Sequence, residues 1–190
     1  MAFGFEGNQV RLVPLEHDRH FENCLRWIND PEVTEWLLID PPMARLAEEE
    51  WFRRACSGED RANQHFAIET LEGVHIGTSG LHGIDHKNGF CSTGSLIGDR
   101  SYWGKGYGTD AARVRAYYIF EVLGLRMAFS GVIEGNEASL RMQAKVGYDI
   151  YGRAPAQYWK RGAYRDHILT VLTRQRWLEC IPSGQSAGSG

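Results

Sequence analysis

Long hydrophobic runs and a leader pattern are both lacking in this sequence. No apolar stretch approaches the roughly 18 to 20 residues that a membrane-spanning helix requires. The opening segment MAFGFEGNQVRLVPLE lacks the basic region followed by an apolar core that a signal peptide needs. These absences predict a cytoplasmic protein without a membrane partner.

Paired cysteines and surplus charge are lacking as well. The four cysteines show no CxxC spacing and no neighbouring histidine cluster, so neither a disulfide framework nor a zinc site is indicated, and we predict no metal. The formal net charge is only -3, which gives no electrostatic reason to bind nucleic acid or an anionic membrane. An anionic ligand would have to be held by local geometry.

The hydrophobic pattern of the 190 residues alternates between helix and strand spacing. Helical spacing predicts helices over 18–30, 44–57, 109–123 and 136–147. Two-residue alternation predicts strands over 9–16, 64–73, 74–85, 89–98, 126–135 and a final hairpin across 148–175. This order predicts one mixed α/β (α+β) domain over 1–180 with a largely antiparallel sheet. We expect the small and polar segment 181–190 to be a disordered tail.

Three glycines alternate directly before one of the predicted helices. Because Gly104, Gly106 and Gly108 carry no side chains, the backbone N–H groups between them can turn toward one ligand. The first amides of the following helix have no acceptor within the helix, which adds a seat for an anion. Lys105 is predicted to add a cation near the rim, with a solvated lysine that has no partner as the alternative. The pattern predicts a phosphate or pyrophosphate site, and a plain glycine-rich turn is the structural alternative.

Two other phosphate-binding motifs compete for the same segment. Residues 106–111 satisfy the dinucleotide pattern GxGxxA, with Glu134 where a ribose-binding acid would sit. That pattern normally opens a parallel βαβ array, whereas an antiparallel meander precedes it here and too little chain follows for a second half. The Walker pattern GxxxxGK[ST] does not occur.

The segment YWGKGYGTDA at 102–111 resembles motif A of the GNAT superfamily of acyl-CoA-dependent N-acyltransferases, usually written [QR]xxGx[GA]. The segment NEASLRMQAKVGY at 136–148 resembles the same family's NxxSxR…KxG[FY] segment, and INDPEV near the start is most similar to the RimJ/RimL-like branch. The resemblance covers about residues 10–177. It implies a GNAT-like domain with a central splayed strand pair flanked by helices. It also implies acetyl-CoA as co-substrate, with a ribosomal-type protein N-terminus or a small amine as acceptor.

The resemblance further implies a set of coenzyme A contacts. The strand GSLIG at 94–98 should correspond to the family's bulged central strand, whose backbone meets the pantetheine arm and the acetyl carbonyl. The loop after it should hold the pyrophosphate, and the start of the last helix should lie near the thiol. The cofactor-binding residues implied in this way are Ser95, Leu96, Ile97, Trp103, Gly104, Lys105, Gly106, Tyr107, Gly108, Thr109, Asn136 and Ser139.

Two features limit this transfer of roles. Trp103 stands where the motif has Gln or Arg, which removes one side-chain donor to phosphate and leaves more of the anion binding to backbone amides. Asn136 is also a good helix N-cap and Ser139 the third residue of that helix, so both have a structural alternative.

Amide formation sets the catalytic requirements. A neutral amine must attack the thioester, the oxyanion needs a donor, and the departing thiolate benefits from a proton. Family members often carry a tyrosine seven residues after Asn136, but here that position is Gln143, which cannot act as an acid. We predict Ser139 as the acid, with another tyrosine or solvent as alternatives. We predict Glu134 as the base, with Asp85 or a water chain as alternatives.

The acceptor is the least defined part of the prediction. The family's acceptor cleft is shaped by the first helices and the last hairpin, which implies Trp36, Trp51 and Tyr158 as substrate-binding residues, although such aromatic residues also build cores. Direct transfer to a primary amine is the favoured function, and a monomer or homodimer fits it. A non-catalytic CoA-binding module, suggested by the missing tyrosine, and a dinucleotide-binding domain are the alternatives.

Overall fold

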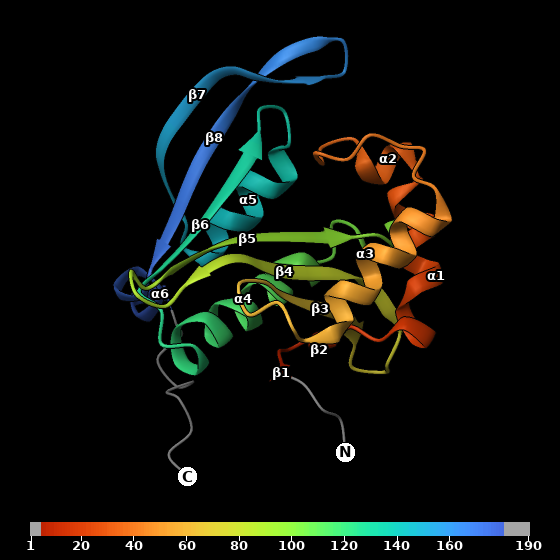
Figure 1. Cartoon of the computed structure of the whole chain (residues 1–190). Helices are drawn as coiled ribbons and strands as arrows, with labels where there is room; N and C mark the ends of the chain where they lie inside the picture. Colours follow the sequence, from red (N-terminus) through yellow and green to blue (C-terminus); the bar gives the residue numbers. More distant parts are fainter. Residues whose placement is uncertain (1–4, 181–190) are drawn as a thin grey trace.

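The computed structural model describes residues 5–180, so the predicted tail at 181–190 lies outside the described residues. One mixed eight-stranded sheet runs through the molecule in the order β1-β2-β3-β4-β5-β6-β8-β7 (Figure 1). Every neighbouring pair is antiparallel except β5 with β6. The strands are β1 (Phe5–Glu6), β2 (Val10–Pro14), β3 (Gln64–Thr70), β4 (His75–Asp85), β5 (Phe90–Ile97), β6 (Met127–Ile133), β7 (Asp149–Lys160) and β8 (Ala163–Thr173).

Helices cover both faces of this sheet, as predicted. One hydrophobic cluster packs α1 and α3 against one face, and a larger cluster packs α4, α5 and α6 against the other. The helices are α1 (His17–Ile28), α2 (Pro31–Thr34), α3 (Arg45–Ser57), α4 (Tyr107–Tyr117), α5 (Glu137–Val146) and α6 (Arg174–Cys180), with a 3-10 turn at Arg100–Tyr102 and a π-helical turn at Tyr118–Val122.

The amphipathic spacing of α1 explains how it seats on the sheet. Its buried residues are His20, Phe21, Cys24, Trp27 and Ile28, which recur on one stripe of the helix. That stripe packs against the α1/α3 face of the sheet, where Val13 and Ala67 contribute from β2 and β3. The helix therefore forms one wall above the centre of the sheet.

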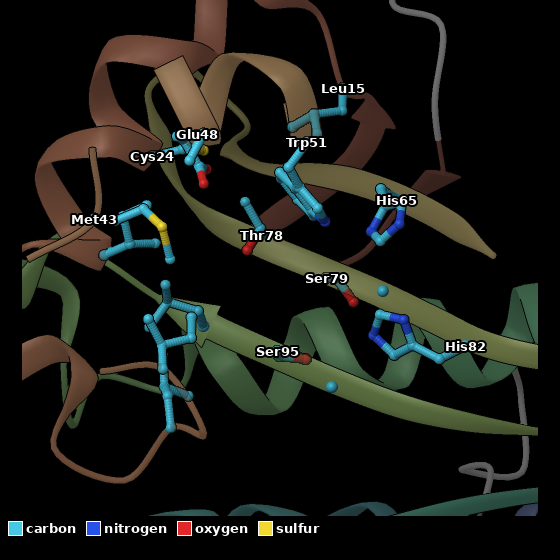
Figure 2. Close-up of a pocket in the computed structure, with 17 residues that line it drawn as sticks. Leu15, Cys24, Met43, Glu48, Trp51, His65, Thr78, Ser79, His82 and Ser95 are labelled. Carbon is cyan, nitrogen blue, oxygen red and sulfur yellow. The ribbon is translucent and has the colours of Figure 1, made fainter. Parts of the chain in front are cut away.

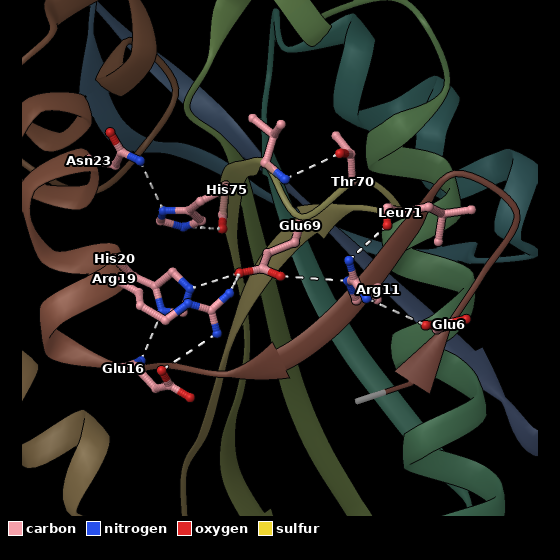
Figure 3. Close-up of polar contacts among 12 residues, drawn as sticks. Glu6, Arg11, Glu16, Arg19, His20, Asn23, Glu69, Thr70, Leu71 and His75 are labelled. Carbon is pink, nitrogen blue, oxygen red and sulfur yellow. Dashed lines mark hydrogen bonds and ion pairs between the residues drawn. The ribbon is translucent and has the colours of Figure 1, made fainter. Parts of the chain in front are cut away.

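A buried carboxylate on β3 ties α1 to the sheet (Figure 3). Glu69 on β3 is only 3% exposed, and its carboxylate accepts hydrogen bonds from Arg19 at 2.5 Å and His20 at 3.2 Å. Arg11 on β2 forms an ion pair with the same carboxylate at 3.6 Å. A buried charge with several partners is costly to disrupt, so this network fixes the position of α1.

His75 on β4 continues the network. Its Nε2–H donates to the carbonyl of Gly77 at 2.9 Å, while its Nδ1 accepts from the amide nitrogen of Asn23 at 3.3 Å. The Asn23 amide is oriented by a hydrogen bond that Arg26 donates to its oxygen. Both ring nitrogens are thus satisfied by the neutral imidazole, and burial lowers the pKa of His75 to about 3.

Most predicted element boundaries differ from the observed ones by a few residues, and two of these differences assign a segment to another element. The helix expected from Thr109 begins at Tyr107, so part of the glycine segment belongs to its first turn. The last strand, expected to reach residue 175, ends at Thr173, and α6 follows directly. The sequence prediction missed both α6 and the short strand β1.

Candidate active site

The sheet opens between its two central strands. Pairing of β5 with β6 is confined to residues 90–92 of β5 and 127–129 of β6. Beyond this point β5 stays paired with β4 as far as Ile97, and β6 stays paired with β8 as far as Ile133. Figure 1 shows the two halves diverging. The edges that face the opening therefore present backbone groups with no strand partner, which confirms the predicted splayed pair.

The predicted bulge does not lie at Ser95–Ile97. The register of β5 with β4 is continuous there and shifts only between His82 and Asp85, near the hairpin turn. The opening thus comes from the divergence of β6 and not from an extra residue in β5.

Polar side chains hold the apex of the opening. Thr93 donates from Oγ1 to the carbonyl of Phe129, and Ser130 donates from Oγ to the carbonyl of Thr93, each at 3.2 Å. Gln143 on α5 then donates to Ser130 Oγ at 3.1 Å and accepts from Thr170 Oγ1 at 2.5 Å. These side-chain hydrogen bonds take the place of the next backbone hydrogen bonds between β5 and β6, so the opening begins at a fixed position.

Gln143 is therefore a structural residue of the apex. It is 5% exposed, and both ends of its amide are engaged. The hydroxyl of Tyr148 lies nearby, 3.2 Å from Thr93 Oγ1. Tyr148 thus places its hydroxyl beside the start of the opening.

The glycine loop lies at the end of β5, before α4. Gly104 and Gly106 have φ angles of 72° and 95°, which side-chain-bearing residues rarely adopt. Nothing lies within 4 Å of a Cβ placed on Gly104, and Lys105 and Trp103 are exposed. The amides of this loop and of the first turn of α4 therefore border open space.

Two interactions fix the loop. The indole N–H of Trp103 donates to the carbonyl of Ile97 at 2.7 Å, which braces the loop against the end of β5. The carboxylate of Asp110 accepts from the amides of Gln9 at 2.8 Å and Val10 at 3.1 Å, which ties the start of α4 to β2. The loop is thus held in place before any ligand binds.

These features fit coenzyme A. The unshielded amides and the positive end of the α4 dipole suit a diphosphate, and the diphosphate contacts of Trp103 to Thr109 stay a prediction. The open edges of β5 and β6 offer backbone hydrogen bonds to an extended arm carrying amides, at the predicted Ser95, Leu96 and Ile97.

Asn136 and Ser139 occupy the first turn of α5. The side chain of Asn136 accepts from the amide of Ser139 at 3.1 Å, so the N-cap role that the sequence left open is present. Glu134 follows the end of β6, and Arg153 donates to its carboxylate at 3.1 Å. Arg153 also donates to Asp166 at 2.8 Å, so Glu134 belongs to a half-exposed ion-pair group.

Asp85, the alternative base, is remote from the opening. It lies in the β4–β5 turn, where Asn88 donates its backbone and side-chain N–H groups at 2.9 and 2.7 Å. These hydrogen bonds lower the pKa of Asp85. Its partner in the ladder is Phe90, at the closed end of the central strands, so the alternative assignment of Asp85 as base is wrong.

A cavity of about 450 Å³ lies on the α1/α3 face of the sheet, beside the open strand (Figure 2). Its floor is formed by residues 78–80 of β4 and 94–96 of β5, and its walls by α1, α3 and the segment between α2 and α3. Because 94–96 also border the opening, the cavity adjoins the place predicted for the thioester. The lining is mainly apolar: Leu15, Cys24, Ile28, Leu37, Ile39, Met43 and Leu96.

The cavity has one acidic side chain and an aromatic end. Glu48 on α3 is 7% exposed, and desolvation raises the pKa of its carboxyl. His65 and His82 stand with Trp51 at the other end, and desolvation lowers the pKa of both imidazoles. Burial raises the pKa of the Cys24 thiol to about 12. Near neutral pH the two imidazoles and the thiol are therefore uncharged.

A buried arginine underlies the cavity floor. Arg115 on α4 is 3% exposed and donates to Ser79 Oγ at 3.1 Å and to the carbonyl of Gly94 at 2.8 Å. It also donates to Ser95 Oγ. These bonds clamp β4 and β5 together at the point where β5 loses its other neighbour.

The three predicted acceptor residues are not brought together. Trp51 lines the cavity. Trp36 lies instead against Gly135 at the end of β6, with the guanidinium of Arg161 over its ring at 5.6 Å. Tyr158 lies on β7, edge-on to His167. Tyr158 thus belongs to the other arm of the opening, and Trp36, in the segment after α2, contacts that arm.

Sequence reasoning missed most of the cavity. Glu48 sits in a run of three glutamates, and only its spacing of four residues from the buried Phe52 marks it as inward-facing. Gly80 and Gly94 are ladder partners, a pairing that no local pattern reveals. Among residues 5–180, no helix is long and apolar enough to cross a bilayer, and no group of three or more potential ligand side chains is placed to hold a metal ion.

Comparisons with known proteins agree with this geometry. Residues 9–149 match the family model described as an acetyltransferase (GNAT) domain. An uncharacterized N-acetyltransferase, p20 of Bacillus licheniformis, is 29% identical over 80% of this chain and 86% of its own. The spermidine N(1)-acetyltransferase of Escherichia coli K12 is 25% identical over 90% of this chain and 89% of its own. These relatives do not establish the narrower RimJ/RimL-like branch.

The fold is shared with a solved structure. The spermidine N-acetyltransferase of Vibrio cholerae, crystallised with CoA and spermine, superposes with a TM-score of 0.82 over 90% of this chain and 98% of its own, at 19% identity. The matched model, the relatives and the opened sheet together place this chain in the GNAT acetyltransferase family, as an N-acetyltransferase that uses acetyl-CoA.

Proposed function

We propose that this chain transfers the acetyl group of acetyl-CoA directly to a small primary amine that binds in the cavity between α1, α3 and the sheet. The observation that carries this proposal is the shared wall: residues 94–96 of β5 border both the opening and the cavity. Reactants placed on the two sides of one strand gain the proximity that direct transfer needs. A protein N-terminus is the other acceptor in the prediction, and the size and apolar lining of the cavity favour a small molecule over it.

In this proposal the residues of the chain position the reactants and provide a hydrogen-bond donor for the oxyanion. Acetyl-CoA supplies the activated acyl group when bound. The glycine loop and the first turn of α4 hold its diphosphate, and the edge of β5 aligns its arm. A backbone N–H of Leu96 or Ile97 serves the oxyanion. Arg115 keeps β4 and β5 in register beneath the reacting groups.

The proton-transfer roles stay predictions. Ser139 as acid and Glu134 as base are both near the end of β6, but Glu134 is engaged by Arg153. The Glu134→Gln and Ser139→Ala variants test them through the pH profile of kcat. A proton-transfer role requires a changed profile, whereas an unchanged profile with wild-type kcat would remove the residue from the chemistry. Homodimer formation and a cytoplasmic location also stay predictions.

The function is tested by titrating coenzyme A and acetyl-CoA and by measuring thiol release with a panel of primary amines. We expect binding of both and amine-dependent release of free thiol. Binding without release in the presence of any amine would instead support the non-catalytic module. Binding of NAD in place of coenzyme A would support the dinucleotide-binding alternative.

A further inference from the structure

The floor of the cavity has a hollow that two paired glycines create. Gly80 and Gly94 are partners in the β4–β5 ladder, and the cavity lies above them. A Cβ on Gly94 would meet only His82 Nε2 at 3.8 Å, so space and not close packing surrounds this position. The ring of His82 lies across the glycine pair, since its Nε2 is 2.9 Å from a Cβ placed on Gly80.

The two ends of the hollow have different chemistry. Trp51, His65 and His82 form an aromatic end, with ring centroids 5.3 Å apart for the first pair and 5.5 Å for the second. The opposite end contains Thr78 and Leu96, which are ladder partners, and Cys24. Glu48 lies one helical turn before Trp51 on α3, and Figure 2 shows its carboxylate directed toward the sheet beside Cys24. The acidic end therefore adjoins Leu96, on the strand that borders the opening.

Glu48 has no partner of its own in the described chain. Neither a hydrogen bond nor an ion pair to another residue of 5–180 engages its carboxylate, although the residue is 7% exposed. A largely desolvated carboxylate without a partner is costly, and a cation or hydrogen-bond donor brought by a ligand would offset that cost. The other titratable groups that line the cavity are Cys24, His65 and His82, none of which provides a positive charge near neutral pH.

We infer that the acceptor is a primary amine with a single positive charge and a compact aromatic body, whose nitrogen binds at Glu48 and whose ring lies over Gly80 and Gly94 against Trp51, His65 and His82. This inference rests on the proposed function and specifies its acceptor. A polyamine would bring two or three ammonium groups to one carboxylate and leave the others desolvated among apolar side chains. An aromatic ring, in contrast, gains contact with the three rings at the far end.

The test uses 2-phenylethylamine, spermidine, putrescine and a short peptide with a free N-terminus as acceptors for the full chain. Thiol release from acetyl-CoA gives kcat/KM, and quenching of tryptophan fluorescence gives amine binding without turnover. We expect kcat/KM for 2-phenylethylamine to exceed that of each other acceptor at least tenfold. A preference for spermidine, putrescine or the peptide would overturn the inference and leave the acetyltransferase function intact.

Three variants locate the amine. Glu48→Gln should lower kcat/KM for 2-phenylethylamine at least tenfold, mainly through KM. Gly94→Leu should fill the hollow and abolish amine binding while coenzyme A still binds. Glu50→Gln, a matched change on the exposed side of α3, should match the wild type. Wild-type kinetics of Glu48→Gln would overturn the role of this carboxylate. Amine binding without thiol release would support the cavity and contradict the proposed function instead.

Discussion

At the scale of single residues, backbone conformation at the glycine loop decides whether an anion can approach. Gly106 has φ at 95° and caps α4, so a side chain there is strained by its conformation and also stands beside the exposed amides. Gly124 has a similar left-handed conformation, with φ at 65° and nothing within 4 Å of its Cβ position, but it follows the π-helical turn far along the chain. A comparison of substitutions at Gly106 and Gly124 therefore separates the effect of backbone strain on stability from the effect of a side chain on ligand binding.

We predict that Gly106→Ala and Gly124→Ala both lower the free energy of unfolding by about 1–2 kcal/mol, because each forces alanine into the left-handed region. Only Gly106→Ala should also weaken coenzyme A binding, by tenfold or more. Urea unfolding and calorimetric titration measure the two effects. Equal coenzyme A affinity in both variants would show that the loop amides do not hold the ligand.

Residue-level patterns placed the glycine loop and the start of its helix together, whereas they did not assemble the cavity. The glycines and the first turn of α4 are local in sequence, so spacing alone places them together. The acceptor cavity combines Glu48, Thr78 and Leu96 from three elements, and only the tertiary arrangement brings them together. Trp36 illustrates the limit, because an aromatic side chain near the predicted cleft packs on Gly135, in the turn after β6.

At the scale of elements, the seating of α1 depends on a neutral histidine. His75 accepts from Asn23 and donates to Gly77, an arrangement that a protonated ring cannot keep because Nδ1 would face a donor. The neighbouring His20 is also buried, and desolvation lowers its pKa too. The rings of the two histidines lie 4.6 Å apart, so charge on one opposes charge on the other.

We predict that stability falls as pH decreases from about 6.5 toward about 3. The folded-state pKa of His75 is below its unfolded value, so the unfolded chain binds more protons in this window and is favoured as pH falls. One such histidine contributes a slope approaching about 1.4 kcal/mol per pH unit. Urea unfolding at pH 7.5 and pH 5 measures it, and His75→Gln should flatten the dependence. An unchanged slope in that variant would assign the acid sensitivity to other groups.

The order of elements was predictable because hydrophobic spacing is local, whereas their ends and distortions were not. The helix predicted over 109–123 changes to a π-helical turn at Tyr118, and Val122 in that turn is 48% exposed. Asp110, although charged, is buried because its carboxylate accepts from the amides of Gln9 and Val10, about one hundred residues earlier. The contact of Asp110 lies outside any local window of sequence.

At the scale of the whole molecule, the tip of the β7–β8 hairpin connects the two arms of the opening. Arg161 pairs with Glu35 at 2.5 Å and lies over the ring of Trp36, and Lys160 approaches Asp40 at 3.8 Å. The contacted segment leads into residues 37–43, which supply part of the cavity wall. The tip therefore steadies the wall from the opposite arm.

We predict that Arg161→Ala raises KM for the acceptor amine about two- to fivefold and leaves kcat nearly unchanged, because the wall loses its brace while the reacting groups stay in place. The melting temperature should change little, since exposed ion pairs contribute about 0–1 kcal/mol. Arg174→Ala removes a comparable exposed pair, with Glu121 at 2.7 Å, near the closed end of the sheet and serves as the control. A larger KM effect in the control would contradict the bracing role.

The side-chain bonds at Thr93, Ser130 and Gln143 have a consequence for the protein before it meets its co-substrate. They hold the facing edges of β5 and β6 apart, and unpaired strand edges can pair with extended segments of other polypeptides. Newly synthesised chains should therefore aggregate most readily when the concentration of acetyl-CoA is low. Bound acetyl-CoA would then cover these edges as well as supply the acetyl group. It would raise the free energy of unfolding in proportion to the logarithm of its concentration.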